Sequence, residues 1–198
     1  MLPRITQCIC ATPLGLTAGN ALEVRESIEV LAGGGPADVV ELTIVLAREM
    51  LDAVGIKQLM DPVDALKNGA AMDSWKKMIR AQGGDPDAKL PVAKENINIL
   101  ADKDGTLSSM DAMSVGIAAW RLGAGRSKQG EKVSFGAGIE IHAKPGAQVK
   151  KGDLIYTLHA DESARFERAQ SALKNSFAIS QDGSVAPRLP LILEKIEG

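Results

Sequence analysis

The chain has 198 residues, of which 45% are hydrophobic, a size that allows one large or two small domains with a buried core. Its 23 basic and 25 acidic residues leave a formal net charge of −2, so no basic field indicates nucleic acid or an anionic membrane as a partner. No apolar run approaches the ~18 residues of a membrane span, and Cys8 and Cys10 alone are too few for a disulfide framework or a structural zinc site.

The first half of the chain predicts a strand followed by helices. Residues 4–12 alternate and carry β-branched side chains, which indicates one strand that ends at Pro13. A helix is predicted over residues 20–31, and the glycines at 33–35 end it. The next predicted helix, over residues 36–54, is apolar on most sides, so we expect it to pack on two faces.

Two more helices complete the first half. Asp61 is a predicted N-cap before a first-turn proline, and Asn68-Gly69 ends the helix that starts there. The helix that follows places methionine and tryptophan on one side, and we expect this stripe to be core rather than a ligand pocket. Its members are Met72, Trp75, Met78 and Ile79.

Residues 1–85 therefore predict a single strand with four helices. A lone strand cannot form a sheet, so we expect the end of a larger α/β domain whose other strands are absent. Uncovered apolar helix faces promote self-association. We therefore expect a homo-oligomer, with the strand at 4–12 pairing between chains.

After a polar, proline-containing segment at 86–95, which we predict to be a linker, the pattern changes to short strands and helices. Asp111 is a predicted cap of the first of these helices. Together the segments predict an α+β module over residues 96–198. The expected strands are 96–99, 139–142, 154–159, 177–179 and 191–193, and the expected helices are 111–122 and 161–175, the second with Phe166, Ala169 and Leu173 inward.

Several short motifs, weak one by one, are specific in their order and spacing. The longest is the stretch at 13–26, PLGLTAGNALEVRE, and the segment at 122–126, LGAGR, follows about a hundred residues later. Others are GGPAD at 34–38, VKKGD at 149–153 and LHA at 158–160. In this order they resemble the C-terminal portion of the thymidine phosphorylase and pyrimidine-nucleoside phosphorylase family.

The resemblance implies a fold and an activity. Residues 1–85 would be the helical end of a truncated large α/β domain, and residues 96–198 would be an α/β-hammerhead C-terminal domain. Members of this family are homodimeric pentosyltransferases. They cleave thymidine or uridine with phosphate, giving the free base and a deoxyribose or ribose 1-phosphate. Phosphate and a pyrimidine nucleoside would thus be the partners of the full-length enzyme in the cytoplasm.

The chemistry needs donors that hold a phosphate and a positive group that stabilises the departing base. The family's phosphate loop and base-binding segment have no counterpart here, so we expect no catalytic or substrate-binding residue in this chain and no activity of the chain alone. The glycines at 33–35 lie between two predicted helices, unlike a phosphate loop. Arg126 could reach an anion, but a cap-and-packing role fits the end of a helix better.

Some members of the family bind a potassium-like ion beside the phosphate loop. The resemblance implies that Leu14 and Thr17 would supply backbone carbonyls and Glu26 a carboxylate, and hard oxygen ligands suit such an ion. The site would be partial, because its remaining ligands belong to the phosphate loop. Otherwise Glu26 would be an ordinary helix charge. No other cofactor is expected.

Two alternatives remain open. A non-catalytic binding or assembly protein is one. The other is a carrier module, since the segment at 146–154 resembles a turn of biotinyl and lipoyl domains, although Lys103 precedes that turn. The two histidines, His142 and His159, lie 17 residues apart with no cysteine or acid in metal-ligand spacing, so we expect structural roles for both.

Overall fold

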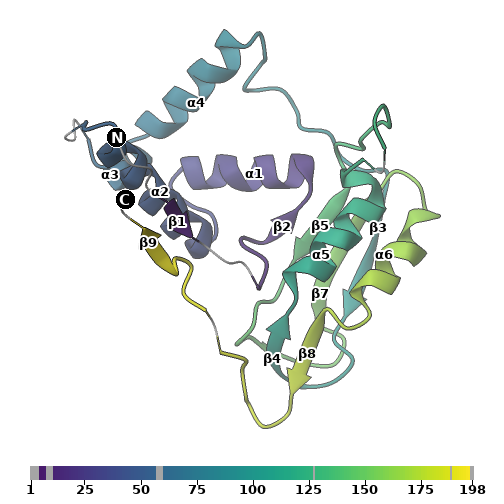
Figure 1. Cartoon of the computed structure of the whole chain (residues 1–198). Helices are drawn as coiled ribbons and strands as arrows, with labels where there is room; N and C mark the ends of the chain where they lie inside the picture. The colour runs from purple at the N-terminus through teal and green to yellow at the C-terminus, as the bar shows by residue number, and fades with distance from the viewer. Residues whose placement is uncertain (1–4, 8–10, 57–59, 127, 188, 197–198) are drawn as a thin grey trace. The chain divides into compact units, whose positions relative to one another are not determined.

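The computed structural model describes residues 5–7, 11–56, 60–126, 128–187 and 189–196, and the chain forms two compact units (Figure 1). Unit 1 comprises Met1–Ile9, Arg25–Lys89 and Leu189–Gly198, and unit 2 comprises Cys10–Val24 and Leu90–Arg188. The units are therefore not contiguous, whereas the predicted domains at 1–85 and 96–198 divide the chain linearly. That division and the linker at 86–95 stay predictions.

The helices of the first half form where local sequence signals place them. Asp61 caps α3 by accepting a hydrogen bond from the Val63 N–H at 2.9 Å, and a proline follows it as the first helical residue. The glycines at 33–35 separate the first two helices. The four predicted helices are thus confirmed: α1 Asn20–Leu31, α2 Ala37–Ala53, α3 Pro62–Lys67 and α4 Ala70–Ala81.

A two-stranded antiparallel sheet joins the ends of the chain within unit 1. β1, Ile5–Gln7, pairs with β9, Glu194–Ile196, in a register that places Ile5 opposite Ile196. The predicted strand at 4–12 is confirmed over residues 5–7 and is wrong at residues 11 and 12, which form a bend, while residues 4 and 8–10 lie outside the described residues. Two expectations need correction. The strand predicted to pair between chains has its partner in the same chain, since β1 pairs with β9. The strand predicted at 191–193 lies at 194–196, because these are the residues that lie opposite β1.

The helices of unit 1 bury little. Val30 of α1 and Leu42 of α2 are buried, and among the described residues neither α3 nor α4 buries a side chain. Met50 and Val54 of α2 are 65% and 64% exposed. The expectations that α2 packs on two faces and that the α4 stripe is core are therefore wrong for this structure: Leu42 is the one residue of α2 that is buried, and in the α4 stripe Met78 is exposed while Met72, Trp75 and Ile79 are only partly buried.

Unit 2 is a small mixed α/β domain with two antiparallel sheets (Figure 1). The four-stranded sheet has the order β2-β5-β7-β3 and the three-stranded sheet the order β6-β4-β8. The strands are β2 Thr17–Ala18, β3 Glu95–Leu100, β4 Gly105–Met110, β5 Gly138–Ile141, β6 Gln148–Val149, β7 Leu154–Ala160 and β8 Phe177–Ser180. Sequence patterns indicated β3, β5, β7 and β8, but not β2, β4 or β6.

Two helices cover one face of the four-stranded sheet (Figure 1). α5, Ala112–Ala119, begins at Asp111, whose carboxylate accepts from the Ser114 N–H at 2.8 Å, and a π-helical turn, η1 Trp120–Ala124, extends it. α6 spans Arg165–Leu173. The predicted inward side chains of α6 are confirmed as buried. They are Phe166, Ala169 and Leu173.

The core of unit 2 fills the space between these helices and the sheets. Ile139 and Ile141 of β5 and Tyr156 and Leu158 of β7 alternate inward and are at most 2% exposed. The Tyr156 hydroxyl lies 3.2 Å from the Ser176 hydroxyl. In the part of the chain that the structure describes, no helix combines the length and apolar character needed to cross a bilayer.

Candidate functional site

The three residues of the predicted cation site fall in different parts of the molecule. Leu14 and Thr17 belong to unit 2, Thr17 as the first residue of β2, and Glu26 belongs to the part of α1 that lies in unit 1. The structure thus brings the two carbonyl donors together in one segment. The position of the Glu26 carboxylate in such a site stays a prediction.

The geometry of β2 suits a carbonyl donor at Thr17. The Leu16 carbonyl accepts from the Ile141 N–H at 2.7 Å, and Thr17 is the residue opposite Glu140. Because hydrogen-bonded and non-hydrogen-bonded pairs alternate in antiparallel strands, the Thr17 carbonyl is directed away from β5, at the edge of the sheet. The Thr17 hydroxyl oxygen is buried and has no hydrogen-bond partner among the described residues.

The segment before β2 is held by a lysine of unit 2. The Lys144 ammonium donates a hydrogen bond to the Pro13 carbonyl, next to Leu14. The oxygens of this segment are of the kind that binds a hard monovalent cation. They are too few to complete a site, however, and within the described residues no group of three histidine, cysteine or acidic side chains could hold a metal ion.

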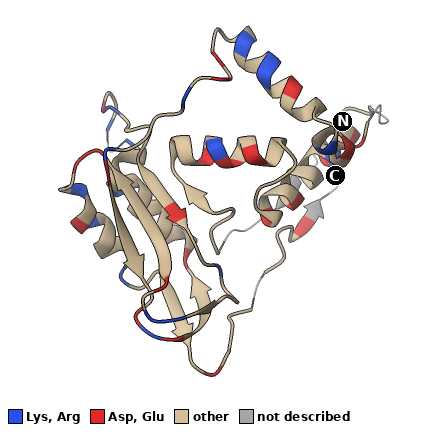
Figure 2. Ribbon diagram, turned by 180° about the vertical axis from the view of Figure 1, so that it is seen from behind, with Lys and Arg blue, Asp and Glu red and all other residues tan. Residues whose placement is uncertain are grey.

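A row of polar side chains crosses the face of the four-stranded sheet opposite the helices. The strand register places Thr17, Glu140, Thr157 and Asn98 side by side on β2, β5, β7 and β3. Seen from behind, the strands of unit 2 carry few charged residues, and most Lys, Arg, Asp and Glu lie in loops and helices (Figure 2). This face is therefore polar but carries little charge.

Both histidines lie on this polar face and bond to its neighbours. The Nε2 atom of His159 lies 3.1 Å from a Glu140 carboxylate oxygen. Nε2 of His142 lies 2.9 Å from the Thr157 hydroxyl, which donates to the Asn98 side-chain oxygen at 3.1 Å. Because Thr157 uses its only proton on Asn98, it accepts from the His142 Nε2–H. These bonds join β5, β7 and β3, as expected of structural histidines.

The glycine-rich segments serve as turns and caps. Gly34 donates to the Glu29 carbonyl at 2.9 Å at the end of α1. At the end of η1, the Asn20 side chain donates to the Ala124 carbonyl at 2.8 Å and the Trp120 indole N–H donates to the Arg126 carbonyl at 3.0 Å. These contacts agree with the cap-and-packing role expected of the segment at 122–126.

A groove that was not expected from the sequence runs along the exposed side of α5. The groove has a volume of about 570 Å³ and belongs wholly to unit 2. Its apolar walls are formed by Met113, Ile117 and Trp120, which follow one another at the helical spacing i, i+4, i+7. These side chains are 70%, 37% and 40% exposed. This spacing is the one feature of the sequence that could have indicated the groove, but it is equally typical of a helix face that is buried in a core. The lining residues are Ala11, Asp111, Ala112, Met113, Gly116, Ile117 and Trp120.

The charge of the groove does not suit phosphate. Among the described residues that line it, Asp111 is the one titratable group. Hydrogen bonds from the Ser114 side chain and N–H lower the pKa of Asp111 below its usual value, so the group is an anion at neutral pH. An anionic wall without a lysine or arginine would repel a phosphate dianion. The groove therefore has the chemistry of an apolar contact surface.

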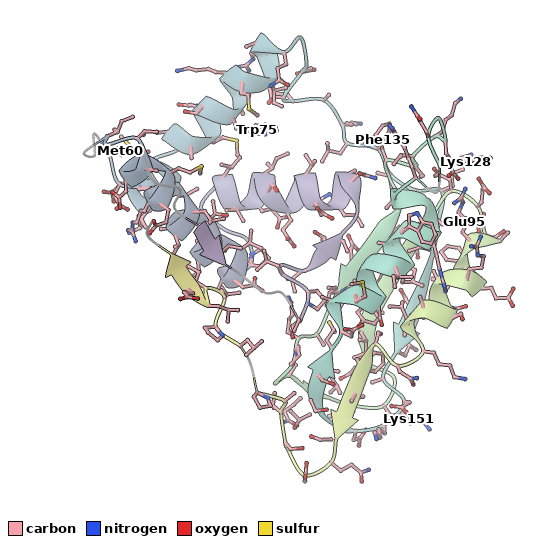
Figure 3. The ribbon with its side chains drawn as sticks, viewed as in Figure 1. Met60, Trp75, Glu95, Lys128, Phe135 and Lys151 are labelled. Atoms are coloured by element: carbon pink, nitrogen blue, oxygen red, sulfur yellow. The ribbon has the colours of Figure 1, made fainter. Side chains whose placement is uncertain are left out.

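The loops that suggested a carrier module lie beside each other. The Lys151 N–H donates to an Asp104 carboxylate oxygen at 2.7 Å (Figure 3 labels Lys151), and the Gly152 N–H donates to the Ala101 carbonyl at 2.9 Å. Lys103 lies between β3 and β4, which belong to different sheets. It is therefore not at the tip of a hairpin of paired strands, the position that a biotinyl or lipoyl acceptor lysine needs.

Comparison with known proteins identifies the class of domain. Residues 106–180, which include β4, α5, β5, β7 and α6, match the family described as the pyrimidine nucleoside phosphorylase C-terminal domain. The matched region lies within unit 2.

Similarity to curated proteins extends over nearly the whole chain. Thymidine phosphorylase of Mycobacterium tuberculosis (strain ATCC 25618 / H37Rv) is 47% identical over 192 residues, which are 97% of this chain and 44% of that protein. Pyrimidine-nucleoside phosphorylase of Geobacillus stearothermophilus is 36% identical over 194 residues, 93% of this chain and 44% of that protein. The Bacillus subtilis (strain 168) pyrimidine-nucleoside phosphorylase is 36% identical over 159 residues, 75% and 37% of the two chains.

The chain belongs to the thymidine phosphorylase and pyrimidine-nucleoside phosphorylase family, and it corresponds to the C-terminal portion of these proteins. It spans less than half the length of the curated relatives it matches.

Proposed function

We propose that this chain is a portion of a pyrimidine nucleoside phosphorylase, whose reaction is phosphorolysis of thymidine or uridine to the free base and (deoxy)ribose 1-phosphate. The observation that supports the proposal is the 47% identity to a thymidine phosphorylase over 97% of this chain. The matched residues are 97% of the chain, so the similarity extends through both units.

We also propose that the chain alone does not catalyse this reaction. Phosphate attack at the anomeric carbon needs several oriented donors around a multiply charged anion. The groove on α5 offers one carboxylate and apolar walls, and the glycine-rich segments are occupied as turns and caps. The chain would therefore supply a structural portion of the enzyme, and the residues that bind the substrates would belong to the remaining portion.

The test is an assay for phosphate-dependent release of thymine from thymidine and uracil from uridine. The chain is measured alone and mixed with a polypeptide that corresponds to the unmatched part of the Mycobacterium tuberculosis thymidine phosphorylase. Turnover only in the mixture is expected. Turnover by the chain alone would show that the described residues contain a complete site. A folded chain that stays inactive in every mixture would favour an assembly role.

We propose further that unit 2 is an α/β hammerhead and that the chain self-associates. The two antiparallel sheets with α5 and α6 are consistent with the first. The second is supported by the large apolar side chains exposed in unit 1, such as Met50, Val54 and Met78. Light scattering at micromolar concentration is expected to show more than one chain per particle, and a clean monomer would contradict this proposal.

A non-catalytic assembly module is the second candidate function. It is favoured by the α5 groove, whose apolar walls and small floor residue, Gly116, are typical of a surface that receives another polypeptide. A carrier module has no such support, and an unmodified intact mass after expression in cells with biotin and lipoate ligases would exclude it.

A further inference from the structure

The described part of unit 2 leaves one long strand edge open, that of β3. This strand comprises six residues, Glu95–Leu100, and is last in the order of the four-stranded sheet. It has β7 on one side and, among the described strands, none on the other (Figure 1; Figure 3 labels Glu95). The other outer strands of the two sheets are shorter, with two residues in β2 and β6 and four in β8. An open edge presents N–H and C=O groups on which another strand can build.

The pairing of β5 with β7 determines which main-chain groups of β7 face β3. In antiparallel strands, the N–H and C=O of one residue point to one side, and those of the next residue point to the other. The His142 N–H donates to the Ile155 carbonyl at 2.9 Å, so the main-chain groups of Ile155 face β5. The main-chain groups of Tyr156 therefore face β3, and so do those of Leu158, two residues further along β7.

The outward groups of β3 follow from this alternation. Ile97 and Ile99 lie opposite these two residues of β7, so their main-chain groups face β7. The position of Ala101 agrees, because its N–H donates to the Asp153 carbonyl at 2.8 Å on the same side of the strand. The main-chain groups that face away from β7 are those of Asn96, Asn98 and Leu100. Within the described residues, these groups make no hydrogen bond to another main-chain group.

The open edge lacks the features that commonly prevent edge strands from pairing. Such strands carry lysines, prolines or inward charges, whereas residues 96–101 contain no proline and no charged residue. Ile97 and Ile99 pack against the core of unit 2 but are only partly buried, and Leu100 is 49% exposed. A further strand beside β3 would therefore satisfy the outward groups and cover apolar surface at the same time.

We propose that β3 pairs with β3 of a second copy of this chain, antiparallel about a two-fold axis, so that the two four-stranded sheets form one continuous sheet. The axis places the outward groups of one strand opposite the same groups of the other. Because β7 already occupies the second side of β3, this pairing ends at two chains. The interface lies in unit 2, so it is independent of the apolar side chains of unit 1 and of any phosphorylase activity.

The side chains of β3 favour one register. With Asn98 on the two-fold axis, Ile97 lies opposite Ile99 of the second chain, and both side chains are on the face that packs against the core. This apolar pair occurs twice by symmetry. With Ile97 on the axis, Glu95 would instead lie opposite Ile99, which leaves a charge against an apolar side chain. The register with Asn98 on the axis is therefore the one that we expect.

The charges at the two ends of the strand favour a second copy as the partner. Lys94 precedes β3 and Asp102 follows it, and both residues are exposed. Because antiparallel strands meet start to end, each Lys94 would lie beside Asp102 of the second chain, where opposite charges stabilise the pair. A parallel partner of the same sequence would place like charges side by side. The edge of β3 is thus complementary to itself in the antiparallel direction.

The experiment follows hydrogen exchange of main-chain amides in the whole chain by NMR at increasing protein concentration. The Leu100 amide should exchange rapidly in dilute solution and become protected as the concentration rises. Asn98→Pro removes an outward N–H and should abolish this protection, whereas Asn98→Ala loses the same side chain and should retain it. The Tyr156 and Leu158 amides, which face β3, should stay protected in both variants. A Leu100 amide that exchanges equally fast at every concentration would overturn the proposal.

A second measurement tests the register and does not depend on the folding of the proline variant. In a chain with Cys8→Ser and Cys10→Ser, Asn98→Cys should give a disulfide-linked dimer on oxidation, because opposite Cα atoms of a hydrogen-bonded pair lie about 5.5 Å apart. Asn96→Cys is the control, since this position lies opposite Leu100 and should stay unlinked. Equal yields at the two positions, or none at 98, would refute the pairing. Association through unit 1 alone would raise the mass in light scattering and leave the Leu100 amide unprotected.

Discussion

The single tyrosine of the chain, Tyr156, offers a stability measurement that can be predicted from its surroundings. Its side chain is fully buried in unit 2, its ring contacts that of Phe177 edge-on with centroids 5.8 Å apart, and its hydroxyl lies 3.2 Å from that of Ser176. Burial raises the pKa of Tyr156 from 10.0 to about 12, because the phenolate would lose its hydration.

The sign and size of the effect follow from proton linkage. The unfolded chain releases the phenolic proton near pH 10, whereas the folded chain keeps it until about pH 12. Stability is therefore unaffected by this group below pH 10 and falls as the pH rises from 10 to 12. At about 1.4 kcal/mol per pH unit, the loss reaches roughly 2–3 kcal/mol.

The assay compares the chain with Tyr156→Phe by urea unfolding across this pH range. The variant gives up the hydroxyl pair with Ser176, at a cost of about 1 kcal/mol near neutral pH, but should lack the alkaline loss. The difference between the two chains should therefore reverse above pH 11. Phenolate absorbance reports the same residue directly, since no other tyrosine is present. A folded chain whose phenolate forms near pH 10 would refute the reasoning.

Three further predictions concern turns, caps and ions. Gly105→Ala should lower the free energy of unfolding of unit 2 by about 2–4 kcal/mol, measured in urea, because φ is 150° and the new Cβ would collide with the Ser180 carbonyl oxygen. The control is Gly130→Ala, at φ 85° in open space, which should cost only about 1 kcal/mol. Equal losses for the two variants would contradict this account. Asp111→Ala should lower the free energy of unfolding by about 0.5–2 kcal/mol, because α5 loses its cap. Below pH 4, where the carboxylate becomes protonated, the stability of the parent chain should approach that of the variant, and a stability difference that stays constant in acid would count against the cap. Asp111→Asn is the control, since it keeps an acceptor for the Ser114 N–H. If the cation site forms, potassium should raise the urea midpoint of unfolding more than lithium at equal ionic strength. When the potassium concentration equals its Kd, the gain in stability is about 0.4 kcal/mol. Glu26→Gln should remove the difference between the two salts. Equal midpoints for the parent chain in the two salts would argue against Glu26 as a ligand.

The helices of this protein could be predicted because their end signals are local. Asp61 and the proline after it determine the start of α3, and the glycines at 33–35 separate α1 from α2, whatever the rest of the chain does. Short strands are different, since a pair such as Thr17–Ala18 has no pattern of its own and exists because β5 lies beside it. The strand expected at 191–193 was misplaced for the same reason.

Exposure could not be predicted from spacing. The stripes on α4 and α5 have the periodicity of core faces, yet Met78 is 48% exposed and Met113 is 70% exposed. A period indicates which side chains share a face, and only the neighbouring elements decide whether that face is covered. The candidate cation residues came from family resemblance, and the orientation of the Thr17 carbonyl became apparent only from the register of β2 with β5.

The pairing of β1 with β9 has a consequence for the order of folding. Ile5 and Ile196 are separated by nearly the whole sequence, so their sheet closes a loop that contains all of unit 2. During synthesis β1 therefore has no partner until unit 2 and β9 have followed it, while the pairing of β5 with β7, close in sequence, could already have formed. The sheet of unit 1 can therefore form only after all of unit 2 has been synthesised.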